Sequence, residues 1–154
     1  MLFIFINIHA QKEKNAAPVS IASEDEEEKS REYKPFQYEL TLKNMHLWRG
    51  IRFTDEAVTT AKLYYTSKNE HFSAGFWGGV GFSGNYTEFD YWISYDYKNW
   101  TFSIWDINNY SDFPDANIFN YDIGETSHFV DVSVNYNFDS IPLQLTWGSI
   151  VLGR

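Results

Sequence analysis

The chain has 154 residues, enough for one domain with a sizeable core, and its formal net charge of −9 argues against nucleic acid as a partner, because a phosphate backbone needs a basic surface. Aromatic residues make up 19% of the chain and favour strands over helices, while the absence of cysteine excludes disulfides and thiolate metal sites. A mean hydropathy of −0.43 argues against a helical membrane protein but is compatible with a β-barrel, whose strands are only half apolar.

The chain begins with an apolar stretch, Leu2 to Ile8, that is too short to cross a bilayer as a helix. It matches the apolar core of a secretory signal with cleavage after Ala10, although no basic stretch precedes it. Residues 1–10 are therefore predicted to be a clipped signal peptide, with a first buried strand as the alternative.

Residues 11–35 are polar and contain a run of acids between Glu24 and Glu32. Such a segment buries too little apolar area to offset its ordering entropy, so we predict a flexible acidic linker. A calcium loop is the sharper alternative, but its spaced ligands and glycine are missing.

Residues 36–154 form the predicted β domain, in which short strands alternate with turn residues such as Gly84-Asn85 and Lys98-Asn99. The pattern predicts an all-β antiparallel meander without helices, with a bulge near Lys43-Asn44 and another near Trp105-Asp106. Seven strands are predicted, at about 36–50, 57–66, 71–83, 86–97, 100–109, 127–138 and 143–152.

Each predicted strand has one apolar and one polar face, because successive side chains point to opposite sides. Between Tyr86 and Tyr97 the odd positions are mostly aromatic or aliphatic, and the even positions include three carboxylates. The only basic residues after Phe72 are Lys98, His128 and Arg154, which is a poor match to a sheet whose polar face meets bulk water. The pattern favours an outer-membrane-type β-barrel, with its apolar face toward lipid and its polar face toward the lumen. The connections support this choice, because three short turns alternate with a set that includes a sixteen-residue loop from Ser111 to Thr126.

Four short motifs, in this order and spacing, resemble the TorF-like porins of Gram-negative bacteria: Trp48-Arg49-Gly50-Ile51, Gly75-Phe76-Trp77, Tyr86-Thr87-Glu88-Phe89-Asp90 and Thr126-Ser127-His128. The resemblance covers about Leu42 to Phe138 and implies a β-barrel in the bacterial cell outer membrane with a pore function. The implied partners are membrane lipid and small solutes or ions, and the resemblance brings no catalytic residue and no cofactor. Because seven strands is an odd number and no terminal aromatic is present, we expect the barrel to be incomplete at its C-terminus.

Six charged residues are predicted to face the lumen, where Glu88 and Asp90 are expected to pair with one of the two basic residues. They are Arg49, Lys62, Glu88, Asp90, Asp96 and Asp131.

No catalytic or metal-ligating residue is predicted. Glu88 and Asp90 have the spacing of paired glycosidase carboxylates, but nothing else in the sequence indicates a sugar cleft. Ser127 and His128, near Asp131, invite comparison with a hydrolase, yet neighbouring strand residues point to opposite faces. The four histidines form no close repeat that suggests a metal site.

The sequence predicts a narrow porin for small solutes or ions rather than an enzyme. Two alternatives stay open, a soluble aromatic-rich β-sandwich that binds carbohydrate and a barrel that is purely structural and does not conduct. The sandwich requires its aromatic residues to form one exposed strip, whereas here they recur on nearly every strand.

Overall fold

The computed structural model describes residues 2–8, 33–112 and 117–153, which form strands and turns and contain no helix. Within these residues there is accordingly no helix long and apolar enough to cross a membrane. The strands are β1 (Leu2–Ile8), β2 (Phe36–Lys43), β3 (His46–Trp48), β4 (Ile51–Thr54), β5 (Val58–Thr66), β6 (Phe72–Gly81), β7 (Thr87–Tyr97), β8 (Trp100–Asn109), β9 (His128–Asn137) and β10 (Leu143–Gly153).

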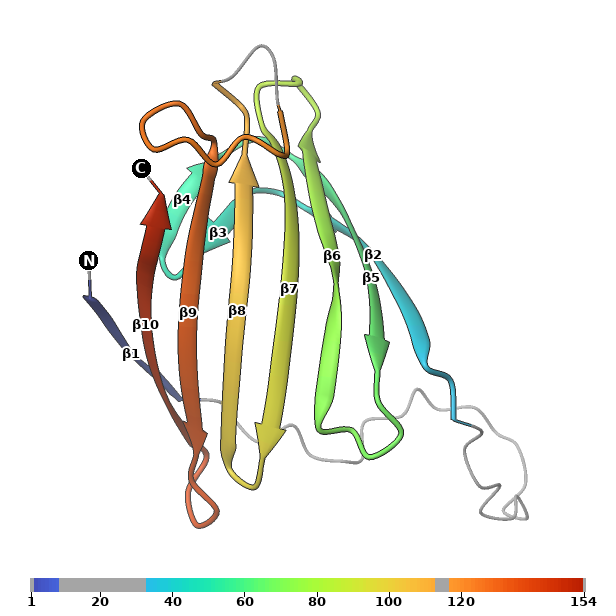
Figure 1. Ribbon diagram of the computed structural model, residues 1–154, viewed down its shortest axis with the longest axis vertical. Helices are drawn as coiled ribbons and strands as arrows, with labels where there is room; N and C mark the ends of the chain where they lie inside the picture. Colours follow the sequence, from blue (N-terminus) through green and yellow to red (C-terminus); the bar gives the residue numbers. More distant parts are fainter. Residues whose placement is uncertain (1, 9–32, 113–116, 154) are drawn as a thin grey trace.

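Eight strands form one curved antiparallel sheet in the order β1-β10-β9-β8-β7-β6-β5-β2 (Figure 1). From β5 to β10 each strand pairs with the next one in the chain, so the predicted antiparallel meander is confirmed. β1 pairs with β10 and β2 pairs with β5, which leaves β1 and β2 at the two edges of the sheet.

The N-terminal segment Leu2–Ile8 is the edge strand β1 in this structure, paired along its length with Leu143–Ser149 of β10. The clipped signal peptide and its alternative, a first buried strand, both stay predictions. The predicted cleavage point after Ala10 and nearly all of the predicted linker lie outside the described residues.

The short connections lie at one end of the sheet and the long loop lies at the other (Figure 1). Residues 67–71, 98–99 and 138–142 join strand pairs at the first end, and residues 82–86, 110–112 and 117–127 lie at the opposite end. This is the separation that the lengths of the connections predict, with the tight turn at Gly84-Asn85 as the expected exception at the end of the long loop.

Two details of the predicted strands are wrong. The single strand expected over 36–50 ends at Lys43, and the chain continues as the separate β3–β4 hairpin instead of passing through a bulge. No bulge occurs near Trp105 and Asp106 either, because β8 pairs with β7 and β9 without a shift of register. The polar Asp106 therefore stays on the face that carries Ile104, for a reason given below.

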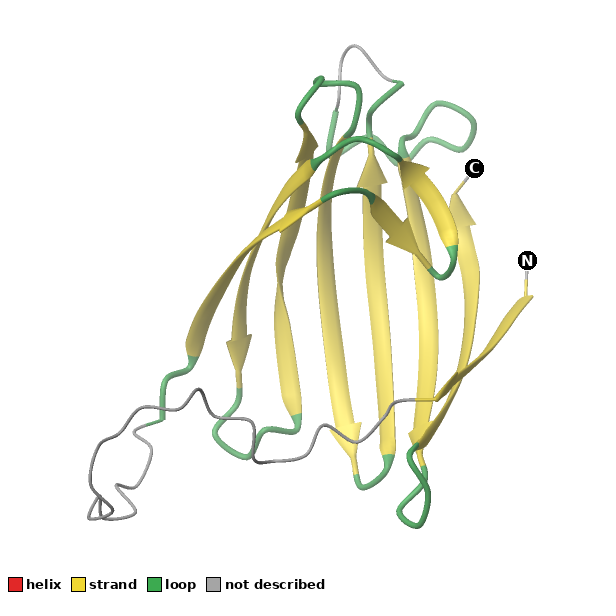
Figure 2. Cartoon of the chain, turned by 180° about the vertical axis from the view of Figure 1, so that it is seen from behind, coloured by secondary structure: helices red, strands yellow, loops and turns green. Residues whose placement is uncertain are grey.

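The β3–β4 hairpin folds over the hollow side of the sheet (Figure 2). We call this side the inner face and the opposite side the outer face. The inner face is polar, and its buried residues include Thr60, Glu88, Asp90 and Asp131. The residues that alternate with them on the outer face are mostly aliphatic or aromatic, and many are exposed.

Candidate functional site

The tip of the β3–β4 hairpin is a two-residue turn between the paired residues Trp48 and Ile51. Arg49 has a φ of 49° and Gly50 a φ of 77°, so both central residues are left-handed, as a type I′ turn requires. Glycine suits the second position because it has no Cβ to strain this conformation. The motif that carries part of the family resemblance therefore forms a tight turn that presents Arg49 to the inner face.

Arg49 forms a two-pronged ion pair with Asp131 of β9. Its two terminal nitrogens donate to the two carboxylate oxygens at 2.7 and 2.5 Å, and the guanidinium lies 4.6 Å from the centre of the Trp48 ring. Gly148 of β10 provides the space, since a Cβ at this position would overlap the guanidinium. The ion pair therefore connects the tip of the hairpin to strand β9.

A cavity of about 170 Å³ lies between the hairpin and the inner face. Glu88 and Asp90 of β7 contribute carboxylates to it, and Lys43 and His46 contribute basic groups. Aromatic side chains supply most of the remaining wall, namely Trp48, Phe53, Trp77, Trp105 and Phe129.

The two cavity carboxylates are deeply buried and have few hydrogen-bond donors. Glu88 accepts a hydrogen bond from the Asn109 side chain at 2.9 Å, and Asp90 accepts one from the Asn108 backbone N–H at 3.3 Å. Neither pairs with Arg49 or Lys62, so the expected pairing is wrong. The reason is that the hairpin turn carries Arg49 past β7 to Asp131 on β9.

His46 is the basic group nearest to Glu88, with 4.0 Å between its Nε2 and Oε1 of Glu88. Burial, with a smaller contribution from the charge of Lys43, lowers the pKa of His46 from 6.5 to about 4. The imidazole is therefore neutral near pH 7. Its Nδ1 is buried and has no hydrogen-bond partner among the described residues.

The other predicted site residues, Lys62 and Asp96, lie on the inner face but do not line this cavity. Lys62 of β5 stands over two aromatic rings, 4.7 Å from the centre of Tyr64 and 4.5 Å from that of Trp92. Asp96, near the end of β7, accepts a hydrogen bond from the Thr101 hydroxyl at 2.5 Å. The six predicted residues thus share one face but divide between the ion pair, the cavity and two separate positions.

A polar cluster on the outer face was missed by the sequence analysis. Asp106 lies 2.7 Å from Nδ1 of His128 and accepts a hydrogen bond from the Tyr121 hydroxyl at 2.6 Å. The Tyr121 ring stacks on His128 at 4.5 Å, so residues of the β8–β9 loop cover both polar groups. Desolvation, then the hydrogen bond to Asp106 and its charge, raise the pKa of Tyr121 to about 12. The one signal in the sequence was the loss of alternation at Asp106.

The arrangement gives no support to a hydrolase site. The Ser127 hydroxyl donates to the Asn108 side chain, His128 pairs with Asp106, and Asp131 pairs with Arg49 on the other face. Within the described residues, no three His, Cys, Asp or Glu side chains are grouped so as to hold a metal ion.

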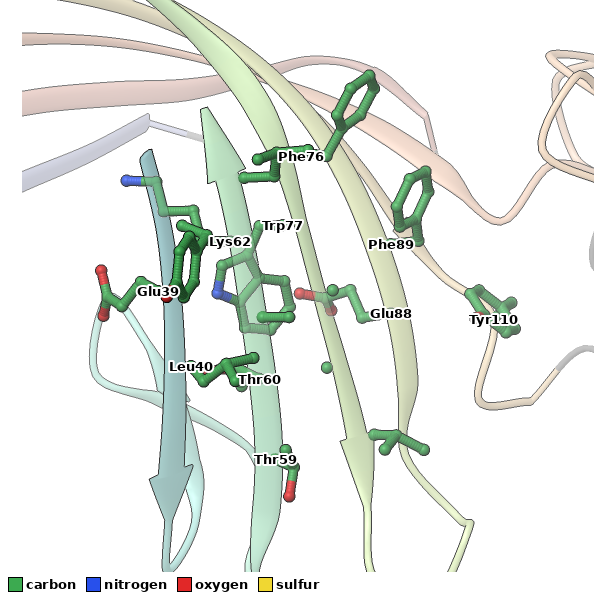
Figure 3. Close-up of a pocket in the computed structure, with 16 residues that line it drawn as sticks. Glu39, Leu40, Thr59, Thr60, Lys62, Phe76, Trp77, Glu88, Phe89 and Tyr110 are labelled. Carbon is green, nitrogen blue, oxygen red and sulfur yellow. The ribbon is translucent and has the colours of Figure 1, made fainter. Parts of the chain in front are cut away.

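A broad groove with mostly apolar walls follows β2, β5, β6 and β7, and residues from both faces of the sheet line it. In Figure 3 Glu88 is directed toward Trp77 and the neighbouring Phe89 is directed the other way. Leu40, Leu63 and Phe76 also line this groove.

No family model, no curated protein and no solved structure matches the chain.

Proposed function

We propose that the sheet is part of the wall of an outer-membrane β-barrel of the TorF-like porin class, whose outer face contacts lipid and whose inner face lines a narrow pore. The observation that carries the proposal is the inverted distribution of side chains. A soluble sheet buries its apolar face, whereas a membrane barrel exposes it.

The exposures of individual residues make the inversion quantitative. Glu88, Asp90 and Asp131 are only 6%, 3% and 2% exposed. Phe76, Ile93 and Phe102, on the same strands or their neighbours, are 48%, 47% and 45% exposed. Exposed apolar area of this extent is costly in water, and contact with hydrocarbon removes the cost.

The topology is compatible with a closed wall. Seven successive antiparallel pairings separate β1 from β2, so these two edge strands run in opposite directions. Opposite directions allow them to pair, and a membrane wall needs its edges paired because lipid offers no hydrogen-bonding groups. The strand number would then be even, as in bacterial single-chain barrels.

The inner face indicates what such a pore would pass. The β3–β4 hairpin occupies part of the hollow side, which narrows the space for a solute. The carboxylates of Glu88, Asp90 and Asp96 have no guanidinium or ammonium within ion-pair distance among the described residues. A lumen lined by acids attracts cations, so we expect a small conductance with a mild preference for cations.

The soluble sandwich is the less favoured alternative. A sandwich requires two packed sheets, whereas residues 2–8, 33–112 and 117–153 form one large sheet and one hairpin. The non-conducting barrel has the same wall as the pore and differs only in conduction.

The lipid-facing assignment is tested by attaching an environment-sensitive label to one of two adjacent residues of β9. Val132 lies on the outer face opposite Ile104, and Ser133 lies on the inner face opposite Ser103. After reconstitution into vesicles, a label on Val132→Cys should be quenched by lipid-borne quenchers, and a label on Ser133→Cys by water-soluble ones. Equal access of the water-soluble quencher to both positions would show that the sheet is not a membrane wall.

A further inference from the structure

We propose that the cavity between the β3–β4 hairpin and β7 is a binding site for a small organic ammonium ion, with Glu88 and Asp90 as its counter-charges and aromatic rings as its walls. The inference names a ligand class for one part of the proposed pore. It does not depend on conduction, because the cavity is formed by the hairpin and the sheet alone.

The first argument is charge. Two carboxylates that are 6% and 3% exposed face one small space, and a buried charge is costly unless it is paired. The guanidinium of Arg49 is bound to Asp131. His46 is neutral near pH 7 and its Nδ1 is buried without a partner, which leaves Lys43 as the only cation in the cavity lining. A cation bound in the cavity would therefore stabilise the ionised form of the two carboxyl groups, which burial alone disfavours.

The second argument is the composition of the wall. Five aromatic side chains line the cavity. Aromatic faces attract cations, and weakly hydrated ammonium groups recognised by such rings are the best-known case. Among the described residues no three His, Cys, Asp or Glu side chains are grouped so as to hold a metal ion.

The third argument is size. A volume of about 170 Å³ is well below the roughly 300–1,000 Å³ of pockets for drug-sized ligands. The cavity can therefore hold a cation of a few heavy atoms but not a nucleotide or an oligosaccharide.

The test compares choline with its uncharged carbon analogue, 3,3-dimethylbutan-1-ol, by saturation-transfer NMR on the folded full chain in detergent micelles at constant ionic strength. Choline should bind saturably, and the neutral analogue, which has the same shape, should bind about tenfold more weakly or not at all. Equal binding of the two would show an apolar pocket without a cation site, and no saturable choline signal would overturn the proposal outright.

The variants locate the site. Asp90→Asn should weaken choline binding about tenfold. Asp96→Asn removes a carboxylate from the same face of the same strand, outside the cavity, and should leave choline binding unchanged. Glu88→Gln is the second test variant in case Asp90→Asn fails to fold, with folding checked by heat-dependent gel migration. Folded variants of both residues that bind choline like the unaltered protein would overturn the assignment.

The outcomes also separate this inference from the proposed function. Binding of choline by a chain that does not insert into vesicles would support the site and refute the membrane wall. Insertion and conduction without choline binding would support the membrane wall and refute the site.

Discussion

The ion pair between Arg49 and Asp131 connects residues that are 82 positions apart in the chain. Asp131 is almost fully buried, so its carboxylate depends on the guanidinium for charge compensation. A buried pair contributes little net stability compared with apolar replacements, but removing one partner leaves a charge that is costly to keep buried. Replacing both partners should therefore destabilise the fold by less than the sum of the two single replacements.

We predict that Arg49→Met alone lowers the free energy of unfolding by about 2–4 kcal/mol, since it leaves Asp131 unpaired. The double variant Arg49→Met with Asp131→Leu should lose less than the sum of the two single variants. Urea unfolding followed by tryptophan fluorescence measures these differences. Lys62→Met, which removes a cation from the same face, is the control and should have a smaller effect. Strict additivity of the two replacements would contradict the role given to the pair.

His46 gives the fold a pH dependence at the residue scale. Its pKa is lowered from 6.5 to about 4, so the unfolded chain binds a proton at this residue between those values and the folded chain does not. Stability should therefore decrease as the pH falls from about 6.5 to about 4, by about 2–3 kcal/mol at most, and His46 should add no further loss below that range. Lys43 works against protonation of the imidazole, and Glu88 is the acidic group that faces it, at 4.0 Å.

The measurement is the denaturation midpoint as a function of pH, compared between the unaltered chain and His46→Gln. The difference between the two curves isolates His46 from the buried carboxylates, which titrate in both proteins. His71→Gln, at an exposed position beside β6, is the matched control for the histidine-to-glutamine replacement itself. An unaltered pH profile in His46→Gln would show that the imidazole is not held neutral by burial.

At the scale of elements, the strands from β5 to β10 could be predicted because alternation and turn residues are local signals. The break after Lys43 could not, because the segment from Asn44 to Trp48 continues to look like a strand. What separates β3 from β2 is a contact with β9, and no local pattern encodes a contact between distant residues. The Arg49–Asp131 pair escaped prediction for the same reason, although both residues were assigned to the same polar face.

The polar cluster on the outer face also escaped prediction because it depends on contacts between residues that are distant in the chain. Asp106 interrupts the apolar side of β8, and from sequence a bulge is the simplest explanation of such an interruption. The structure keeps the register and instead covers Asp106 with Tyr121 from the following loop. The polar cluster lies toward the end of the sheet that carries this loop, so it does not interrupt the apolar surface nearer to the short turns.

At the scale of the whole molecule, the chain combines the curved sheet, which is the proposed membrane wall, with the β3–β4 hairpin. The wall has an apolar outside and an acidic inside, and the β3–β4 hairpin covers part of the inside. If the wall is a pore, the hairpin determines how narrow it is. The register offers a clean way to remove the hairpin, because Lys43 and Val58 are direct partners in the β2–β5 ladder.

We predict that replacing residues 44–57 by Asn-Gly, a favoured two-residue hairpin turn, leaves the sheet intact and enlarges the pore. In planar bilayers under a salt gradient, the unaltered protein should show small cation-preferring currents, and the variant should show a clearly larger conductance with the preference retained. The preference should persist because Glu88, Asp90 and Asp96 belong to β7 and stay in place. Choline binding should be lost, because the hairpin supplies His46, Trp48 and Phe53 to the cavity.

Equal conductance in the two proteins would contradict a narrowing role for the hairpin, and anion preference in either would contradict the acidic lumen. Silence in both, with insertion confirmed by the labels on β9, would identify the barrel as structural.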